Sequence, residues 1–185
     1  MAEEKQIVLE QPELGKAIRR MAHEIVEKCA NPDELVLIGI RSRGVHLARR
    51  LARAVEDIRN SSPLVAVIDV SPYRDDRTAA SGNPPDRAFE IAAAVDDKTV
   101  ALVDDVIFRG RTIRAAMEAV ERLGQPKRIL VVALIDRGAR ELPIRADIVG
   151  KNIAVADGQR VNVRLLESDG MDQVVLVNWQ SKSGT

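Results

Sequence analysis

Apolar residues recur along the chain in two patterns, short unbroken runs and stripes at helical spacing. Short aliphatic runs are typical of buried strands, whereas stripes at three and four residues indicate amphipathic helices. The runs and alternating segments that predict strands lie at 35–40, 63–70, 100–103, 128–135, 160–166 and 173–178. The stripes that predict helices lie at 12–28, at 45–56 and from about residue 111 to 120. Because strands alternate with helices over most of the chain, we expect an α/β protein with a mainly parallel central sheet flanked by helices.

The stretch 100–120 joins a predicted strand to a predicted helix through a short polar loop. Asp104 and Asp105 follow the apolar run, and Gly110 and Thr112 stand at the start of the helix. The N–H groups and the positive dipole at a helix start favour an anion, and paired carboxylates accept hydrogen bonds from two vicinal hydroxyls. This order suits a phosphorylated sugar, although acids and glycine also make ordinary turns that bind nothing.

Two further strands end in polar turns. The turn at 41–44 reads Arg-Ser-Arg-Gly, and Asp136 and Arg137 follow the run at 128–135. The carboxyl ends of parallel strands converge on one crevice, so these turns should lie beside the loop that follows residue 103. The arginine turn would suit a second anionic group such as pyrophosphate.

Composition describes an ordinary soluble protein of one domain, residues 1–185, with 45% hydrophobic and 30% charged residues. No run of eighteen apolar residues predicts a membrane span, and the acidic N-terminus lacks the apolar segment of a secretory signal. A single cysteine, Cys29, excludes an internal disulfide and suits a cytoplasmic compartment. Basic and acidic residues balance at 28 each, so bulk charge does not indicate nucleic-acid binding. Two histidines and one cysteine argue against a transition-metal site.

Residues 71–90 have no helical or strand periodicity and are rich in Pro, Gly, Ser and charge. Long loops of this kind in compact domains are often lids or disordered segments. The loop contains a polar cluster, Tyr-Arg-Asp-Asp at 73–76. Its Arg74 either neutralises an anionic ligand or is a solvated loop charge.

Several stretches together resemble the PyrR family of pyrimidine operon regulators, a branch of the type I phosphoribosyltransferases. The segment 100–112 is similar to the phosphoribosyl pyrophosphate (PRPP) motif of the type I enzymes, and IGIRSRG at 38–44 to their pyrophosphate loop. The PyrR branch is indicated by RMAHEIVE at 20–27, by YRDD at 73–76 and above all by DRGARELPIRADIVGKNI at 136–153. The resemblance covers about residues 12–178.

The resemblance implies a type I phosphoribosyltransferase fold with a lid at about 71–90 and a small hood at about 136–160. It implies a uracil phosphoribosyltransferase that converts uracil and PRPP, with Mg²⁺, to UMP and pyrophosphate. It also implies an RNA-binding regulator that responds to UMP and attenuates transcription of pyrimidine genes by binding an mRNA leader. A cytoplasmic homodimer or higher homo-oligomer is the assembly that it implies.

The resemblance also assigns roles to residues. Catalytic roles fall to the two ribose-binding carboxylates and to two arginines that stabilise pyrophosphate, Asp104, Asp105, Arg41 and Arg74. The PRPP site comprises Val100, Ala101, Leu102, Val103, Asp104, Asp105, Val106, Ile107, Phe108, Arg109, Gly110, Arg111 and Thr112. The pyrophosphate loop comprises Arg41, Ser42, Arg43 and Gly44, and the base hood Asp136 and Arg137. The RNA-binding candidates are Arg19, Arg20, His23, Arg137, Arg140, Arg145 and Lys151. No side chain is assigned as a metal ligand.

The chain departs from the family pattern in several places. Arg109 replaces a Thr or Ser, Ala139 replaces a His, and residues 154–156 and 71–72 also differ. Arg109 either contacts the phosphate or points to solvent. Two alternatives therefore stay open: an RNA-binding or nucleotide-sensing regulator with little catalysis, and a phosphoribosyltransferase for another base. Phe108 stands where purine-using relatives place an acid, which favours a pyrimidine.

Overall fold

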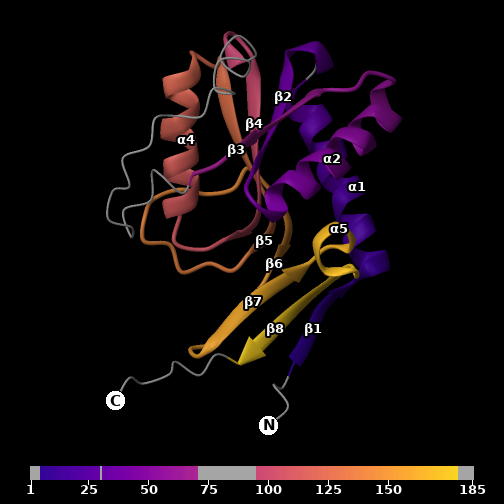
Figure 1. The fold of residues 1–185 in the computed structure, drawn as a ribbon, viewed down its shortest axis with the longest axis vertical. Helices are drawn as coiled ribbons and strands as arrows, with labels where there is room; N and C mark the ends of the chain where they lie inside the picture. Colours follow the sequence, from indigo (N-terminus) through magenta and orange to yellow (C-terminus); the bar gives the residue numbers. More distant parts are fainter. Residues whose placement is uncertain (1–4, 30, 71–94, 179–185) are drawn as a thin grey trace.

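The computed structural model describes residues 5–29, 31–70 and 95–178 (Figure 1). Its strands are β1 (Lys5–Glu10), β2 (Leu35–Ile40), β3 (Leu64–Ile68), β4 (Thr99–Ile107), β5 (Arg128–Asp136), β6 (Ile148–Asn152), β7 (Gln159–Arg164) and β8 (Gln173–Asn178). Its helices are α1 (Gln11–Lys28), the short 3₁₀ turn η1 (Pro32–Glu34), α2 (Arg43–Arg59), α4 (Arg111–Leu123) and the one-turn α5 (Leu166–Asp169). The predicted lid, including Arg74, lies outside the described residues.

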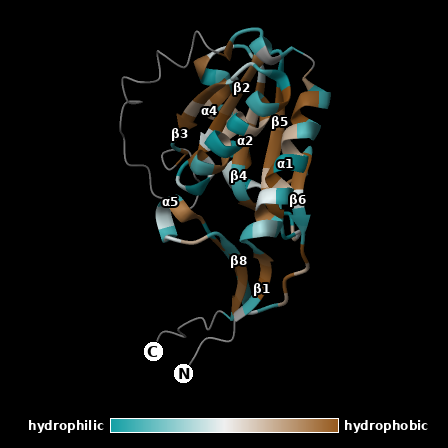
Figure 2. Ribbon diagram, turned by 90° about the vertical axis from the view of Figure 1, so that its right-hand side faces the viewer, coloured by the Kyte–Doolittle hydropathy of each residue, from teal (hydrophilic) through white to brown (hydrophobic). Residues whose placement is uncertain are grey.

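Five strands form a parallel sheet in the order β3-β2-β4-β5-β6. Alternate residues of the central strands enter two different cores, because successive side chains of a strand point to opposite faces. Leu37, Ala101 and Val132 pack with α1 and α2, whereas Ile38 and Leu102 pack with α4. Figure 2 shows these strands as mainly hydrophobic, between helices whose outer sides are hydrophilic. Helices cover both faces, which explains why the strands are unbroken apolar runs rather than alternating ones.

The predicted fold class is confirmed, and so are most of the predicted elements. The helices predicted at 12–28 and from residue 111, and the strands at 35–40 and 173–178, lie where the pattern placed them. The strand predicted at 100–103 is longer than expected. β4 continues to Ile107 because Asp104, Val106 and Ile107 pair with β5, so the two acids lie within the strand and not after it.

A second, antiparallel sheet has the order β1-β8-β7 and joins the two ends of the described chain. This small sheet is built from β1, β7 and β8. The segment 136–160, predicted as a hood, contains β6, which pairs with β5 at the edge of the large sheet. The sequence did not predict β1 or β6, because each is short and becomes a strand only through pairing with a distant partner.

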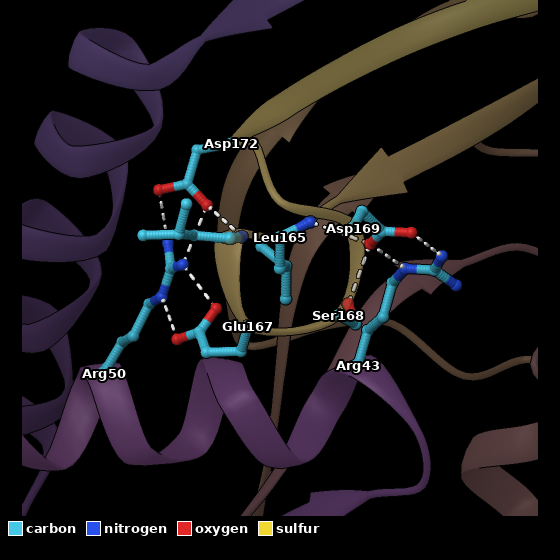
Figure 3. A network of polar contacts seen from close by, with 8 residues as sticks. Arg43, Arg50, Leu165, Glu167, Ser168, Asp169 and Asp172 are labelled. Carbon is cyan, nitrogen blue, oxygen red and sulfur yellow. Dashed lines mark hydrogen bonds and ion pairs between the residues drawn. The ribbon is translucent and has the colours of Figure 1, made fainter.

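Two arginines of α2 bind the connection between β7 and β8, and so join it to the helix that packs on the large sheet (Figure 3). The Arg50 guanidinium donates to both oxygens of Glu167 at 2.8 and 2.6 Å, and to both oxygens of Asp172 at 2.9 and 2.7 Å. About two helical turns earlier, Arg43 donates to Asp169 at 2.9 and 3.3 Å. The hydrogen bonds from Arg43 and from the Leu165 N–H hold the pKa of Asp169 well below its ordinary value. These pairs fix the small sheet relative to the start of α2.

Replacing Arg50 with Met keeps the aliphatic volume and removes the charge, so Glu167 and Asp172 lose their common partner. We expect the free energy of unfolding to fall by about 2 kcal/mol in Arg50→Met. Urea denaturation followed by circular dichroism measures the change. The exposed neighbour Arg49 is the control, and Arg49→Met should stay within about 0.5 kcal/mol of the wild type. Equal losses in the two variants would contradict the role of Arg50.

The difference in the free energy of unfolding between the wild type and Arg50→Met should depend on pH. The hydrogen bond from Arg50 lowers the pKa of Glu167, and although burial raises the pKa of Asp172, bonds from Arg50 and the Leu166 N–H lower it overall. A carboxyl whose pKa is lowered by folding stabilises the protein above its unfolded pKa of about 4, and this share is lost as pH falls through the folded value. The difference between the wild type and Arg50→Met should therefore be full at pH 7 and smaller at pH 3.

Candidate functional site

The loop between β4 and α4 bounds a cavity of about 380 Å³. Gly110 caps α4 with φ at 91°, a left-handed conformation that suits glycine. The cavity is lined by the end of β4, the start of α4 and one residue of a distant segment: Asp104, Val106, Ile107, Phe108, Arg109, Gly110, Arg111, Thr112, Ile113 and Glu141. A cavity at the N-terminus of a 13-residue helix is suited to an anion.

Asp104 and Asp105 are oriented by the backbone that follows them. The Asp105 N–H donates to Asp104 Oδ1 at 2.9 Å, and the Val106 N–H donates to Asp105 Oδ1 at 2.9 Å. Asp104 is buried, with 7% of its surface exposed, and lines the cavity; Asp105 is half-buried and is not among the lining residues. Burial of a carboxylate costs free energy that a function in binding would explain.

The arginine turn after β2 lies directly against the middle of β4, at Val103 and Asp104. A Cβ atom on Gly44 would stand 2.4 Å from the carbonyl oxygen of Val103, and one on Gly39 would stand 2.5 Å from Cα of Val45. Only glycine permits both approaches. The peptide bond between Arg41 and Ser42 is cis. The structure thus brings the turn at 41–44 beside Asp104.

The two arginines of this turn have different surroundings. The Arg43 guanidinium is bonded to Asp169 and therefore anchors the turn to the small sheet. Arg41 is more exposed, with 64% of its side chain accessible, and its Nη1 atom stands 3.4 Å from Asp69 Oδ2. Arg41 is therefore the more available of the two to a ligand.

Arg140 clamps a third segment, residues 136–144, onto the β4–α4 loop. Its guanidinium donates to the Phe108 carbonyl at 2.8 Å, to Asp136 Oδ2 at 2.6 Å and to the Ile144 carbonyl at 2.9 Å. Only 18% of this side chain is exposed. Arg140, considered an RNA contact on sequence grounds, thus serves to shape the loop.

Phe108 lies between two guanidinium groups. The Arg137 carbon Cζ is 3.8 Å from the ring centroid and that of Arg109 is 5.1 Å away. Burial lowers the pKa of Arg137, and the positive charge of Arg109 adds to this. Among the described residues, Arg137 Nε is a buried side-chain nitrogen without a hydrogen-bond partner. The predicted base-hood residues Asp136 and Arg137 therefore adjoin the cavity through Phe108.

The Arg109 side chain is exposed, but it is paired with a carboxylate. Its Nε atom is 3.1 Å from Glu141 Oε1, and Arg111 Nε is 2.8 Å from Glu141 Oε2. Glu141 is not among the site residues predicted from the sequence. The only available signal was the presence of two arginines around Gly110, which favours a nearby carboxylate but does not say which one.

The remaining RNA-binding candidates gather mainly around α1 and β6. Arg20 forms an ion pair with Glu24 and donates to the carbonyl oxygens of Val149 and Gly150 at 2.9 and 2.6 Å. Lys151 donates to the Val8 carbonyl at 3.1 Å. The side chains without such contacts in this group, all exposed, are Arg19, His23 and Arg145. Arg20 thus joins α1 to the edge strand.

Within 5–29, 31–70 and 95–178, no three His, Cys, Asp or Glu side chains are grouped so that they could hold a metal ion. None of the helices in these ranges is long and apolar enough to cross a membrane.

Known proteins that resemble the chain in sequence and in fold are phosphoribosyltransferases. Residues 5–167 match the family model described as "Phosphoribosyl transferase domain". The fold is similar to the crystal structure of the hypoxanthine phosphoribosyltransferase of Trypanosoma cruzi, with a TM-score of 0.70, 20% identity and coverage of 95% of this chain and 97% of that one. The fold and the cavity at the start of α4 thus define a phosphoribosyltransferase domain.

Two curated relatives narrow the class. The chain is 48% identical over 177 residues to "Bifunctional protein PyrR" of Pelotomaculum thermopropionicum, covering 96% of this chain and 98% of that protein. It is 49% identical to the protein of the same name from Chloroflexus aurantiacus, covering 96% and 97%. The chain belongs to the PyrR family, as its motifs predicted.

The close contact at Gly44 can be tested by adding one methyl group. Gly44→Ala places a Cβ against the Val103 carbonyl, and the backbones of β4 and α2 must separate to admit it. We expect a loss of about 1–3 kcal/mol in the free energy of unfolding, measured by urea denaturation. Gly15→Ala is the control, because nothing lies within 4 Å of its added Cβ in α1, and it should stabilise the protein by about 0.5–1 kcal/mol. Equal stability of Gly44→Ala and the wild type would contradict the contact.

Proposed function

We propose that this protein is a uracil phosphoribosyltransferase that also binds the mRNA leader of pyrimidine genes in response to UMP. The observation that carries the enzyme activity is the placement of Asp104 and the N-terminus of α4 around one cavity, directly beside the arginine turn at 41–44. PRPP requires an anion site for its 5-phosphate, a carboxylate for its ribose hydroxyls and a basic turn for its pyrophosphate. The naming of its relatives as bifunctional supports the second activity.

PRPP would bind with its 5-phosphate in the cavity. The backbone N–H groups at the start of α4 and the hydroxyl of Thr112 donate to the phosphate oxygens, helped by the helix dipole. Asp104 and Asp105 accept hydrogen bonds from the ribose 2- and 3-hydroxyls. The backbone bonds that already orient these carboxylates reduce the entropy lost on binding.

In the reaction, N1 of uracil forms a bond to C1 of the ribose while the bond from C1 to the pyrophosphate oxygen breaks. The pyrophosphate leaves with the electron pair of the broken bond, and the proton of N1 passes to water. Positive charge on the ribose is stabilised by Asp104 and Asp105, and negative charge on the leaving group by Arg41 and, from the lid, Arg74. Catalysis consists mainly of positioning and electrostatic stabilisation.

Magnesium fits this arrangement as a companion of the substrate. Mg²⁺ is usually held by one or two carboxylates together with substrate phosphates and water, not by a cage of protein ligands. Asp104, which lines the cavity, and its neighbour Asp105 are the carboxylates that would hold the ion beside the substrate. Bound there, the ion would shield the charge of the diphosphate.

The base would lie at the segment that follows β5. Asp136 is held by Arg140 and by the Gly138 N–H at 2.8 Å, so its carboxylate is already engaged and neighbouring backbone groups are left to read the edge of uracil. Phe108 stands where purine-using relatives place an acid, and its uncharged side chain favours a pyrimidine. The single cysteine, Cys29, is free and buried, in keeping with a cytoplasmic setting.

The enzyme assignment is tested by measuring UMP formation from uracil, PRPP and Mg²⁺. The double variant Asp104→Asn/Asp105→Asn should lower the rate by about 100-fold or more, because the carboxylates no longer stabilise the ribose charge. It should also lose PRPP binding in calorimetry while keeping its unfolding midpoint. The exposed Asp57 of α2 is the control, and Asp57→Asn should leave both quantities unchanged.

Unaltered activity in the double variant would refute the ribose assignment. A wild-type protein that binds PRPP without turnover would instead favour the alternative of a regulator without catalysis. Turnover with another base in a substrate panel would favour the third reading, a phosphoribosyltransferase of different specificity.

The RNA-binding activity rests on the basic surface around α1 and β6, with Arg19 and His23 exposed on α1 and Lys151 on β6. Arg19→Gln should weaken binding of pyrimidine leader RNA and reduce the slope of log affinity against log salt by about 1, as expected for one lost phosphate contact. Filter binding over a series of salt concentrations measures both. UMP should tighten RNA binding in the wild type through linkage.

The control for the RNA measurement is Arg122→Gln. Arg122 lies on α4, which covers the opposite face of the sheet from α1, and it is paired with Glu118. Its replacement should leave the affinity unchanged. A salt-independent affinity, or equal effects of the two variants, would count against an RNA site at α1.

A further inference from the structure

We infer that Glu141 is an internal anion that competes with the 5-phosphate of the substrate for the two arginines of the phosphate loop. The inference rests on the proposed function, since it concerns the same cavity. It assigns to Glu141 a positioning role that sets the affinity of the site for phosphate. It also gives Arg109, which departs from the family pattern, a defined partner.

The geometry is that of one carboxylate shared by two guanidinium groups at the wall of the cavity. Glu141 Oε1 is 3.1 Å from Arg109 Nε, and Oε2 is 2.8 Å from Arg111 Nε. All three residues line the cavity: Arg109 and Arg111 flank Gly110, and Glu141 comes from the segment that follows β5. The carboxylate therefore occupies the position where an anionic ligand would meet both arginines.

The backbone of this segment is fixed, while the side chain of Glu141 is not. The N–H groups of Glu141 and Leu142 donate to the Arg109 carbonyl at 3.1 and 3.2 Å, and Arg140 holds the segment to the loop. In contrast, 40% of the Glu141 side chain is exposed, as are 55% of Arg109 and 46% of Arg111. The three side chains can exchange partners without moving the backbone.

Electrostatics decide the direction of the effect. An exposed ion pair contributes little to stability, so separating Glu141 from its arginines costs little. A phosphate dianion carries more charge than the carboxylate, and it too forms charge-assisted bonds with guanidinium groups. Entry of the phosphate thus transfers the arginines from Glu141 to the ligand. A carboxylate left beside the phosphate repels it, which lowers the affinity.

The test measures binding of ribose 5-phosphate by calorimetry and the KM for PRPP in the UMP-forming assay. In Glu141→Gln, the Kd for ribose 5-phosphate should fall about three- to tenfold, because the competing charge is gone. The KM for PRPP should fall with it, whereas kcat should not rise, since product phosphate is held more tightly. A purely structural role of Glu141 would not tighten binding.

Glu118→Gln is the matched control. Glu118 also bridges two arginines, with Arg114 Nη1 at 3.3 Å and Arg122 Nη2 at 2.6 Å, but on α4 away from the residues that line the cavity. Its replacement should leave the Kd unchanged. In a background that carries Arg109→Thr, the gain from Glu141→Gln should shrink, because one of the contested arginines is absent.

Three results would overturn the inference. They are an unchanged or weaker affinity in Glu141→Gln, an equal gain in Glu118→Gln, or a full gain in the Arg109→Thr background. Each leaves the proposed function intact, provided that the wild type binds ribose 5-phosphate. A folded wild-type protein that does not bind it would overturn both proposals together.

Discussion

The backbone of Gly44 approaches the Val103 carbonyl so closely that no side chain fits between them. This contact joins the turn after β2 to the middle of β4, next to Asp104, and the site depends on it. A second glycine, Gly39, lets the start of α2 approach β2 in the same way. Because the strands are parallel and adjacent, their carboxyl ends lie at one edge. The basic turn and the buried carboxylate Asp104 thereby share one location.

Arginines then complete the arrangement from three directions. Arg50 and Arg43 tie the start of α2 to the connection between β7 and β8 (Figure 3), and Arg140 ties the segment after β5 to the loop after β4. Each uses bidentate or multiple hydrogen bonds, which only the planar guanidinium offers. Arg109 and Arg111, in contrast, are exposed and share a single carboxylate. The partly buried arginines give the site its shape, and the exposed ones remain able to change partners.

This division suits a protein with two activities. The cavity at the start of α4 and its three segments lie at the carboxyl edge of the sheet, whereas the exposed basic residues gather around α1 and the edge strand β6. β5 connects the two regions, because it ends at the segment held by Arg140 and its second half pairs with β6, which contacts α1. A ligand at the cavity and an RNA at α1 would therefore both lie against strands of the same sheet or elements packed on it. Such a connection provides a physical basis for linkage between nucleotide and RNA.

The sequence by itself determined the α/β class, the buried strands β2, β4 and β5, the helices that cover them, and the position of the polar loop between β4 and α4. These follow from apolar runs, helical periodicity and local motifs, all of which act over short distances. Tertiary structure decided the rest. β1 and β6 exist only through pairing with distant strands, and the acids of the motif lie inside β4 because β5 extends the pairing. Glu141 joins the site only because Arg140 folds its segment onto the loop, a contact between residues about thirty positions apart that no local pattern encodes.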